Sequence, residues 1–505
     1  MRIELKQSLR DLPAHLFGID LRSLAVFRIG AGLLILYDLI HRARDLTAHY
    51  TELGVMPREN LKAYFWADEY FTIHALGGSP AYAATLFAIA GLCAVALILG
   101  YRTRLFTILS WFFLISLQTR NIILLNGGDI VFRLMLFWGM FLPLGARWSL
   151  DSLWRNVRPS RPRVLHTASF CFILQLALVY VFNFFTKSDD IWRVDHDALY
   201  YAMHLDYLSS GLGKSLLQYP ELLRALTRST LFFELCAPFL LLVPFFTAKL
   251  RTFTVFSFIG FHLGLIIFMD LGLFPYICIV YWLALLPPGF WTFLHRRGLR
   301  RPSIPPPKGL RFLYHPIETA EFKGKAQLQR TGAILAHLFC AFTMAYVMLW
   351  NLRTVNPYFE KRLPDGFNRF GYALVIFQEW NMFAPYPVKD DGWYLVKLSL
   401  KDGSEVDGIT GGAFSFDKPS RMNYFSDNPR WRKYMSYLRK TADWNKEQRY
   451  HFENFIRTDW DRRHRDEPDR QVAEIRTWFM RERTGPPGTP TPFAVRKDRL
   501  HPKAP

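Results

Sequence analysis

Cysteine is scarce in this chain, and its placement excludes two common roles. The five cysteines all fall inside apolar runs: Cys93, Cys171, Cys236, Cys278 and Cys340. None has the spacing of a metal site, and none lies in a predicted outer loop where a disulfide would form. We therefore interpret them as small packing residues and expect no metal cofactor.

Two further absences bear on the class of protein. Residues 1–20 intersperse charged with apolar side chains and lack a small-residue cleavage site, so we predict no removable signal peptide. The chain also shows no internal repeat. Secondary transporters are commonly built from inverted repeats with polar groups near the membrane midplane, so this absence disfavours a transporter.

Long apolar runs dominate what is present. The 505 residues are 51% apolar and 16% aromatic, which is too apolar for an ordinary soluble enzyme. A helix needs about 20 mostly apolar residues to cross a bilayer. The runs that approach or reach this length predict an all-α polytopic membrane domain of about nine transmembrane helices, at roughly 21–41, 78–100, 105–119, 129–146, 166–186, 229–247, 252–270, 273–293 and 331–352.

The net charge of +20 is a topology signal in such a chain. Lys and Arg concentrate in every second predicted loop, at 102–104, 147–163, 249–251 and 296–311, whereas the alternate loops are mixed or nearly free of both. Basic loops remain in the cytoplasm, so we predict a cytoplasmic N-terminus and an outer location for everything after about Arg353. The charge thus indicates membrane insertion and lipid contact, and no nucleic-acid partner is expected.

The pattern divides the chain into three parts. Residues 1–352 are the transmembrane domain, interrupted by a Pro-rich basic linker at 298–330. Residues 353–485 are predicted to form an exoplasmic α+β domain, and 486–505, rich in Pro and charge, a disordered tail.

Local patterns predict the elements of the outer domain. Residues 391–400 are typical of a strand that turns at 401–404 into a second strand. The segments 429–441, 445–464 and 470–482 carry apolar residues at roughly helical spacing.

Several polar side chains fall within the predicted spans or at their ends, where desolvation is costly and a functional role is the default interpretation. By the predicted topology all but Arg28 lie in the outer half of the membrane. Structural polar residues would be scattered in depth, so we predict one shared cavity open to the outer leaflet or the exterior. The residues that define it are Asp38, Asn126, Asp129, Arg133, Lys187, Glu234 and His262.

The residues at 126–133 also have structural explanations, which stay open at this point. Asp129 and Arg133, four residues apart on one helix, would neutralise each other. Asn126 and Asp129 around two glycines are typical of a helix N-terminus, where the helix dipole favours an acidic side chain.

The other three residues have structural explanations too. Glu234 and His262 would form an interhelical hydrogen bond that contributes only to packing. Lys187 would extend to the membrane surface and pair with Asp189 or Asp190.

Six groups of segments occur in an order that is typical of one family. They are Asp-Leu-Arg-Ser-Leu-Ala-Val-Phe-Arg at 20–28, Leu-Asn-Gly-Gly-Asp at 125–129 with 137–138 and 142–145, Lys187 with Trp192, Phe-Phe-Glu-Leu-Cys-Ala at 232–237, Phe-His at 261–262 with 271–276, and Trp-Asn-Met-Phe-Ala-Pro at 380–385. Over about 20–400 the chain resembles bacterial membrane proteins of the HTTM type, which are related to vitamin K-dependent gamma-carboxylase.

The resemblance implies a chemistry. In the carboxylase, a lysine base is coupled to oxygenation of a reduced naphthoquinone, which generates a strong base that deprotonates glutamate before carbon dioxide adds. A buried amine beside apolar rings is suited to general-base work. Carried over, the resemblance implies reduced vitamin K or a related quinone as cofactor and Lys187 as the catalytic base. It assigns substrate or quinone binding to Asn126, Asp129, Arg133, Trp192, Glu234 and His262.

The chain departs from the carboxylase at three points. Gly127 and Gly128 stand where the carboxylase has a histidine beside its asparagine, the outer domain has no cysteine for the enzyme's disulfide, and this domain is shorter. Oxygenation of the quinone is therefore better supported than carboxylation of glutamate.

A second class of function stays open, namely a non-catalytic membrane protein that binds or scaffolds a lipid or a partner protein through the same cavity. Arginine at position 187 would separate the enzyme from the non-catalytic protein, because arginine stays protonated and cannot act as a base.

The Arg and Trp residues of the outer domain have two interpretations. They would contact an exoplasmic protein substrate or partner or lipid headgroups, or they would form an ordinary packed surface. The resemblance implies a bacterial inner membrane location with a periplasmic or extracellular C-terminal domain.

Overall fold

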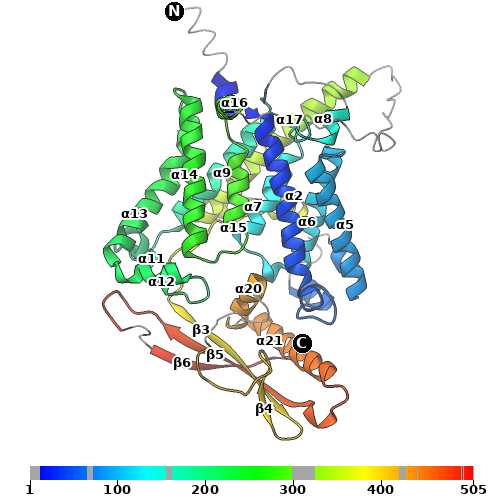
Figure 1. Ribbon diagram of the computed structural model, residues 1–505, viewed down its shortest axis with the longest axis vertical. Coiled ribbons are helices and arrows are strands. Elements are labelled where there is room, and N and C mark those ends of the chain that lie inside the picture. The colour runs from blue at the N-terminus through cyan, green and yellow to red at the C-terminus, as the bar shows by residue number, and fades with distance from the viewer. Residues whose placement is uncertain are drawn as a thin grey trace, which may run out of the picture.

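The long helices of the protein run side by side between two ends, one carrying the N-terminus and the other a small β-sheet (Figure 1). The computed structural model describes residues 12–64, 72–154, 162–297, 325–364, 366–419, 428–440, 442–490, 492 and 494–503. Most of the linker predicted at 298–330 lies outside these residues.

The main helices are α2 (Leu21–Ala43), α5 (Pro80–Leu99), α6 (Thr103–Arg120), α7 (Gly127–Gly139), α9 (Thr167–Thr186), α13 (Pro220–Cys236), α14 (Thr247–Phe268), α15 (Phe274–Leu283), α16 (Pro288–Arg296) and α17 (Lys325–Val355). Short helices connect them: α3 (Leu46–Tyr50), α4 (Arg58–Tyr64), α8 (Leu150–Trp154), α10 (Asp190–Arg193), α11 (Ala198–His204), α12 (Gly211–Ser215), α18 (Pro357–Glu360) and α19 (Phe367–Ala373). Two-residue strands β1 (Ile19–Asp20) and β2 (Arg163–Val164) pair antiparallel near the N-terminus.

Among the described residues, six helices are long and apolar enough to cross a membrane, and α15 with α16, bent by 84°, forms a seventh if counted as one broken span. This confirms the helical membrane class of the domain. The remaining two predicted spans, 105–119 and 129–146, correspond to α6 and α7. The 13 residues of α7 extend only about 20 Å, short of the roughly 30 Å of a hydrocarbon core, so the count of nine stays a prediction.

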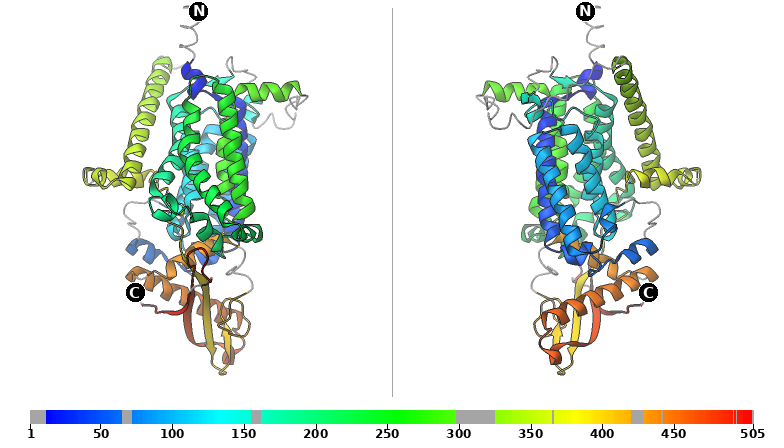
Figure 2. Two further views of the ribbon diagram at one scale, coloured as in Figure 1. Left: turned by 90° about the vertical axis from the view of Figure 1, so that its left-hand side faces the viewer. Right: turned by 90° about the vertical axis from the view of Figure 1, so that its right-hand side faces the viewer.

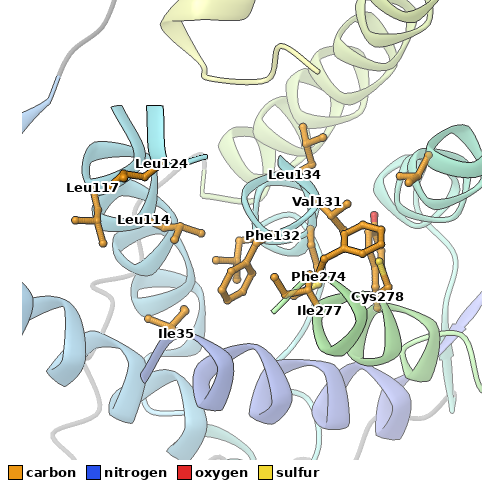
Figure 3. Close-up of a cluster of buried hydrophobic side chains, with 14 of the residues drawn as sticks. Ile35, Leu114, Leu117, Leu124, Val131, Phe132, Leu134, Phe274, Ile277 and Cys278 are labelled. Carbon is orange, nitrogen blue, oxygen red and sulfur yellow. The ribbon is translucent and has the colours of Figure 1, made fainter. Parts of the chain in front are cut away.

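The short helix α7 is the centre of the bundle. It packs against α6, α9 and α15, and it is buried from Val131 to Gly139. Figure 3 shows Val131 and Phe132 of α7 among side chains from α2, α6 and α15, such as Ile35, Leu114 and Ile277. Neighbouring helices enclose α7, with Asp129 and Arg133 buried together with its apolar side chains, which is why α7 need not reach across a bilayer.

The basic turns predicted on one side of the membrane gather at one end of the bundle. The α5–α6 turn, the start of α14 and α16 all lie at the end that carries the N-terminus (Figure 1). There Arg28 caps α5 by donating to the carbonyl oxygens of Leu97 at 2.8 Å and Ile98 at 2.7 Å, which explains its position away from the other polar residues. Which end faces the cytoplasm stays a prediction.

The opposite end carries a four-stranded antiparallel sheet in the order β4-β3-β5-β6. The strands are β3 (Asp390–Leu400), β4 (Glu405–Asp407), β5 (Val472–Arg483) and β6 (Ala494–Leu500). Helix α21 (Asp443–Arg463) packs on β5, and α20 (Pro429–Leu438) lies between this domain and the membrane bundle (Figure 1). The α+β composition of this part and the β3–β4 hairpin agree with the sequence pattern.

Two sequence predictions for this part are wrong. Within 470–482, the residues from Val472 onward belong to β5 instead of a helix. Pairing with β3 along Val472–Arg483, with one register shift at Ser399/Leu400, outweighs a roughly helical spacing of apolar residues. Residues 494–500, predicted to lie in a disordered tail, form β6 on the free edge of β5.

Glu453 of α21 makes the stability of this domain depend on pH. The side chain is 7% exposed and its Oε1 accepts a hydrogen bond from Thr477 Oγ1 at 2.8 Å. Burial raises the pKa of Glu453 to about 7. The Glu453 carboxyl group therefore holds its proton more tightly in the folded protein than in the unfolded chain. The resulting stabilisation is complete below about pH 4.5 and is lost as the pH rises through about 7.

We therefore expect Glu453→Gln, which mimics the protonated side chain, to flatten the fall in melting temperature of the outer domain between about pH 5 and pH 8. The matched control is Glu474→Gln, at an exposed position of β5. It should leave the change of melting temperature with pH as in wild type. A wild-type slope in the Glu453 variant would contradict this assignment.

Candidate functional site

One face of α9 carries a line of polar side chains through an otherwise apolar helix. Tyr180, Asn183 and Lys187 are spaced by three and four residues, so they lie on the same side of the helix axis. Lys187 itself is the residue that follows the last turn of α9. This line faces α13 and α14, whose polar residues were placed at the same depth by the sequence.

Lys187 Nζ forms a buried ion pair with Glu234 Oε2 of α13, and the two side chains are 3% and 5% exposed. Asn183 Nδ2 donates to the other carboxylate oxygen, Glu234 Oε1, at 2.8 Å. The Trp192 ring lies 4.8 Å from Lys187 Nζ, and Trp192 Nε1 donates to the Phe383 carbonyl oxygen at 2.9 Å. A cation, a carboxylate, an amide and an indole are thus assembled away from water.

The alternative in which Lys187 reaches the surface and pairs with a neighbouring aspartate is not adopted. Asp189 instead caps α10, where its Oδ1 accepts from Ile191 N at 3.0 Å. The partner of Lys187 comes from a helix 47 positions away in the sequence. A buried ion pair of this kind costs much desolvation and stands only with good geometry and further hydrogen bonds, which Asn183 supplies.

His262 joins the same face of α9 through Tyr180. The Tyr180 hydroxyl lies 2.7 Å from His262 Nε2 and accepts from Trp282 Nε1 at 2.8 Å. The sequence left open a hydrogen bond between Glu234 and His262. In the structure each contacts α9 separately: Glu234 through Asn183 and Lys187, and His262 through Tyr180. Among the described residues, His262 Nδ1 is buried and has no hydrogen-bond partner.

Asp129 belongs to a second buried cluster, built around α7 and α2. Its Oδ1 accepts from Arg42 at 2.7 Å and from Arg430 Nη2 at 2.8 Å, and Asp129 Oδ2 also pairs with Arg430. Asp38 completes the group by accepting from Arg42 at 2.7 Å and Arg430 at 3.0 Å. Two guanidinium groups and two carboxylates thus balance one another, and we call them the four-charge cluster.

Asn126 and Arg133 have structural partners near this cluster. Asn126 caps α7, since its Oδ1 accepts from Gly128 N at 2.8 Å while Asp129 Oδ2 accepts from Asn126 N at 2.8 Å. Arg133 donates to Gln118 Oε1 at 3.2 Å and to the Phe377 carbonyl oxygen at 2.6 Å. The expectation of a helix N-terminus at Asn126 is confirmed.

The polar residues predicted to share one cavity therefore occupy two clusters. Lys187, Trp192, Glu234 and His262 lie along α9, whereas Asn126, Asp129 and Arg133 lie on α7. The sequence did not single out the partners that complete them: Tyr180, Asn183, Arg42 and Arg430. Two of these had a usable signal: Asn183 is an amide one helical turn before Lys187 in an apolar run, and Arg42 follows Asp38 by four residues.

The outer domain is joined to the bundle by the first turn of α20. Asn428 Nδ2 donates to Asp45 Oδ2 at 2.7 Å, and Arg430 enters the four-charge cluster. Arg432 pairs with Asp270 at 2.9 Å and also contacts the Tyr207 carbonyl oxygen. The outer domain therefore inserts an arginine between α2 and α7, at the end of the bundle opposite the N-terminus.

The fold and these sites define a helical integral membrane protein with buried ion pairs and an attached α+β domain. Within the described residues, no group of three or more His, Cys, Asp and Glu side chains is arranged to hold a metal ion. Residues 18–290 match the HTTM domain model, and the chain belongs to the HTTM domain family. No curated protein and no solved structure gives a significant match.

Removing Arg430 from the four-charge cluster leaves two buried carboxylates with one cation. We expect Arg430→Met to destabilise the protein by about 3–5 kcal/mol, measured as a lower melting temperature in detergent. Arg432→Met, whose partner Asp270 is largely exposed, should cost only about 1 kcal/mol.

A second substitution tests the charge balance directly. Adding Asp38→Asn to Arg430→Met removes one carboxylate and leaves Asp129 with Arg42, so part of the lost melting temperature should return. Equal losses for the two arginine variants, or no recovery in the double variant, would show that the cluster does not control stability.

Proposed function

We propose that this HTTM protein is a membrane enzyme related to vitamin K-dependent gamma-carboxylase, in which Lys187 is the base for oxygenation of a reduced quinone. The observation that carries the proposal is the Lys187–Glu234 pair, sealed from water and supported by Asn183 and Trp192. The proposed topology has nine spans in a bacterial inner membrane, a cytoplasmic N-terminus and an exoplasmic outer domain.

Glu234 gives Lys187 a way to become a neutral base without taking up or releasing a proton. One hydrogen bond joins Lys187 Nζ to Glu234 Oε2. Moving its proton from Nζ to Oε2 converts the ion pair into an amine and a protonated carboxyl group. Burial disfavours charged forms, so the two arrangements lie closer in energy than in water. The amine lone pair then accepts the hydrogen bond of the new carboxyl group, and it becomes able to accept a substrate proton once Nζ turns from Oε2 toward the substrate.

The residues around this pair fit a reduced quinone. Asn183 Oδ1 and His262 Nδ1 are both buried and have no hydrogen-bond partner in the part of the chain that the structure describes, and they suit the hydroxyl groups of such a ring. The surface outside the pair is apolar, with Phe185 50% and Phe232 71% exposed on the flanks of α9 and α13. A hydrophobic ring could approach from the lipid and meet hydrogen-bonding groups beneath this surface.

A bound reduced quinone would give up four electrons in all to molecular oxygen, with one oxygen atom ending in the quinone epoxide and the other leaving as water with the two hydroquinone protons. The chain's own residues prepare this step. Asn183 orients the Glu234 carboxylate by donating to Oε1, so that Oε2 faces Lys187. Trp192 covers Lys187 and is held through Phe383, which excludes water from the amine. Preorganised groups of this kind need little rearrangement during reaction.

The proposal predicts that membranes containing the wild-type protein convert reduced vitamin K or another reduced naphthoquinone into its epoxide. Lys187→Ala should lower the rate by at least about 100-fold, the usual contribution of a general base. Lys187→Arg should fail equally, because arginine stays protonated. Glu234→Gln removes the proton acceptor and should also lower the rate strongly. Epoxide is followed by chromatography.

Lys187→Arg is the matched control for folding, since it keeps a cation beside Glu234 and its melting temperature can be compared with wild type. Equal epoxide formation by wild type and Lys187→Arg would exclude lysine as the base. No epoxide from folded wild-type protein with several naphthoquinones would favour the non-catalytic lipid-binding or scaffold function. Labelled bicarbonate and a glutamate peptide in the same assay test coupled carboxylation and an exoplasmic protein substrate.

A further inference from the structure

A groove with a volume of about 440 Å³ opens at the N-terminal end of the bundle, between α14 and α16. It lies at the other end of the membrane domain from the four-charge cluster (Figure 1). We call it the α14–α16 groove. The side chains and backbone that matter for its chemistry are Ala248, Lys249, Phe253, Pro287, Gly289 and Phe290.

The groove exists because α16 turns away from the bundle. The axes of α15 and α16 differ by 84°, and Figure 2 shows α16 projecting sideways, away from the end of the bundle. Trp291 Nε1 holds α16 to α2 by donating to Ser23 Oγ at 2.7 Å. The Phe256 and Phe290 rings, 5.7 Å apart, join α14 to α16. The position of α16 is therefore fixed by Trp291 outside the groove and by the wall residue Phe290.

The walls of the groove are apolar and reach the surface. Phe253 is 62% exposed, and Pro287 and Phe290 form the opposite side. Gly289 and Ala248 keep the space between the walls open, because neither has a side chain large enough to fill it. Such a lining accommodates a hydrocarbon chain. Its one hydroxyl group, Thr252 Oγ1, donates within α14 to the Ala248 carbonyl oxygen at 2.8 Å.

Lys249 adds a positive charge at the groove. It is exposed, its Nζ lies 5.9 Å from the Phe246 ring, and within the described residues it has no carboxylate partner. Arg296 and Arg297, at the end of α16, are exposed as well. An unneutralised cation beside an apolar channel at a membrane boundary is complementary to a molecule with a hydrocarbon chain and an anionic head.

We propose that the α14–α16 groove binds one anionic phospholipid, with an acyl chain between Phe253 and Phe290 and the phosphate of the headgroup at Lys249. The site is independent of the quinone chemistry at Lys187. It uses the bend between α15 and α16, so lipid binding would hold α16 in its sideways position.

The test measures lipid binding to the purified full-length protein by native mass spectrometry, using phosphatidylglycerol and phosphatidylcholine with identical chains. Wild type should retain one phosphatidylglycerol more tightly than phosphatidylcholine. Lys249→Glu should weaken phosphatidylglycerol binding by about tenfold. Gly289→Phe should weaken it by a similar factor through filling the groove, and a Cβ at Gly289 meets open space, so the fold should tolerate the change.

Lys401→Glu, in the exposed β3–β4 turn, is the matched charge control and should bind like wild type. Loss in Lys249→Glu without loss in Gly289→Phe would mean diffuse attraction to a basic surface and would overturn the site. Loss in Gly289→Phe alone, or equal binding of both lipids, would overturn selection of an anionic head. Displacement of the lipid by glycerol phosphate at equal concentration would assign the site to a free phosphate ester.

Discussion

The four-charge cluster is the interaction on which the arrangement of the two domains depends. Asp38 and Arg42 come from α2, Asp129 from α7 and Arg430 from α20, so one balanced group joins the edge of the bundle, its centre and the outer domain. Each charge is buried, and removing any one leaves its partners without compensation in a medium where isolated charges are costly. The outer domain therefore cannot separate from the bundle without exposing or unbalancing this group.

The polar line on α9 follows the same rule with a different consequence. Lys187 and Glu234 neutralise each other, and Asn183 satisfies the carboxylate oxygen that the lysine leaves free. The four-charge cluster uses arginines, which stay protonated and form several fixed hydrogen bonds. The α9 pair uses a lysine, which can lose its proton. Similar burial thus produces a rigid joint at Arg430, whereas at Lys187 it is one of the grounds for the proposed proton-transfer role.

The depth argument from the sequence found Lys187, Glu234 and His262 because charged groups inside apolar runs are expensive. It could not separate the α9 group from the α7 group, since depth carries no information about direction around a helix bundle. Arg430 was out of reach for the same reason: it lies 301 positions from Asp129 in a segment with many arginines. Strand β5 was misread because its pairing partner β3 lies far away in the sequence.

The amino-acid order alone established the membrane class, the runs that become long helices, the β3–β4 hairpin and the cap at Asn126, because each depends on residues within about one helical turn or one apolar run. Contacts between distant segments settled everything else. They chose Glu234 over Asp189 as the partner of Lys187, gave Asp129 two arginines from other elements and placed β6 on the sheet. Desolvation is the physical reason: a buried charge takes whichever partner the packed helices bring within reach.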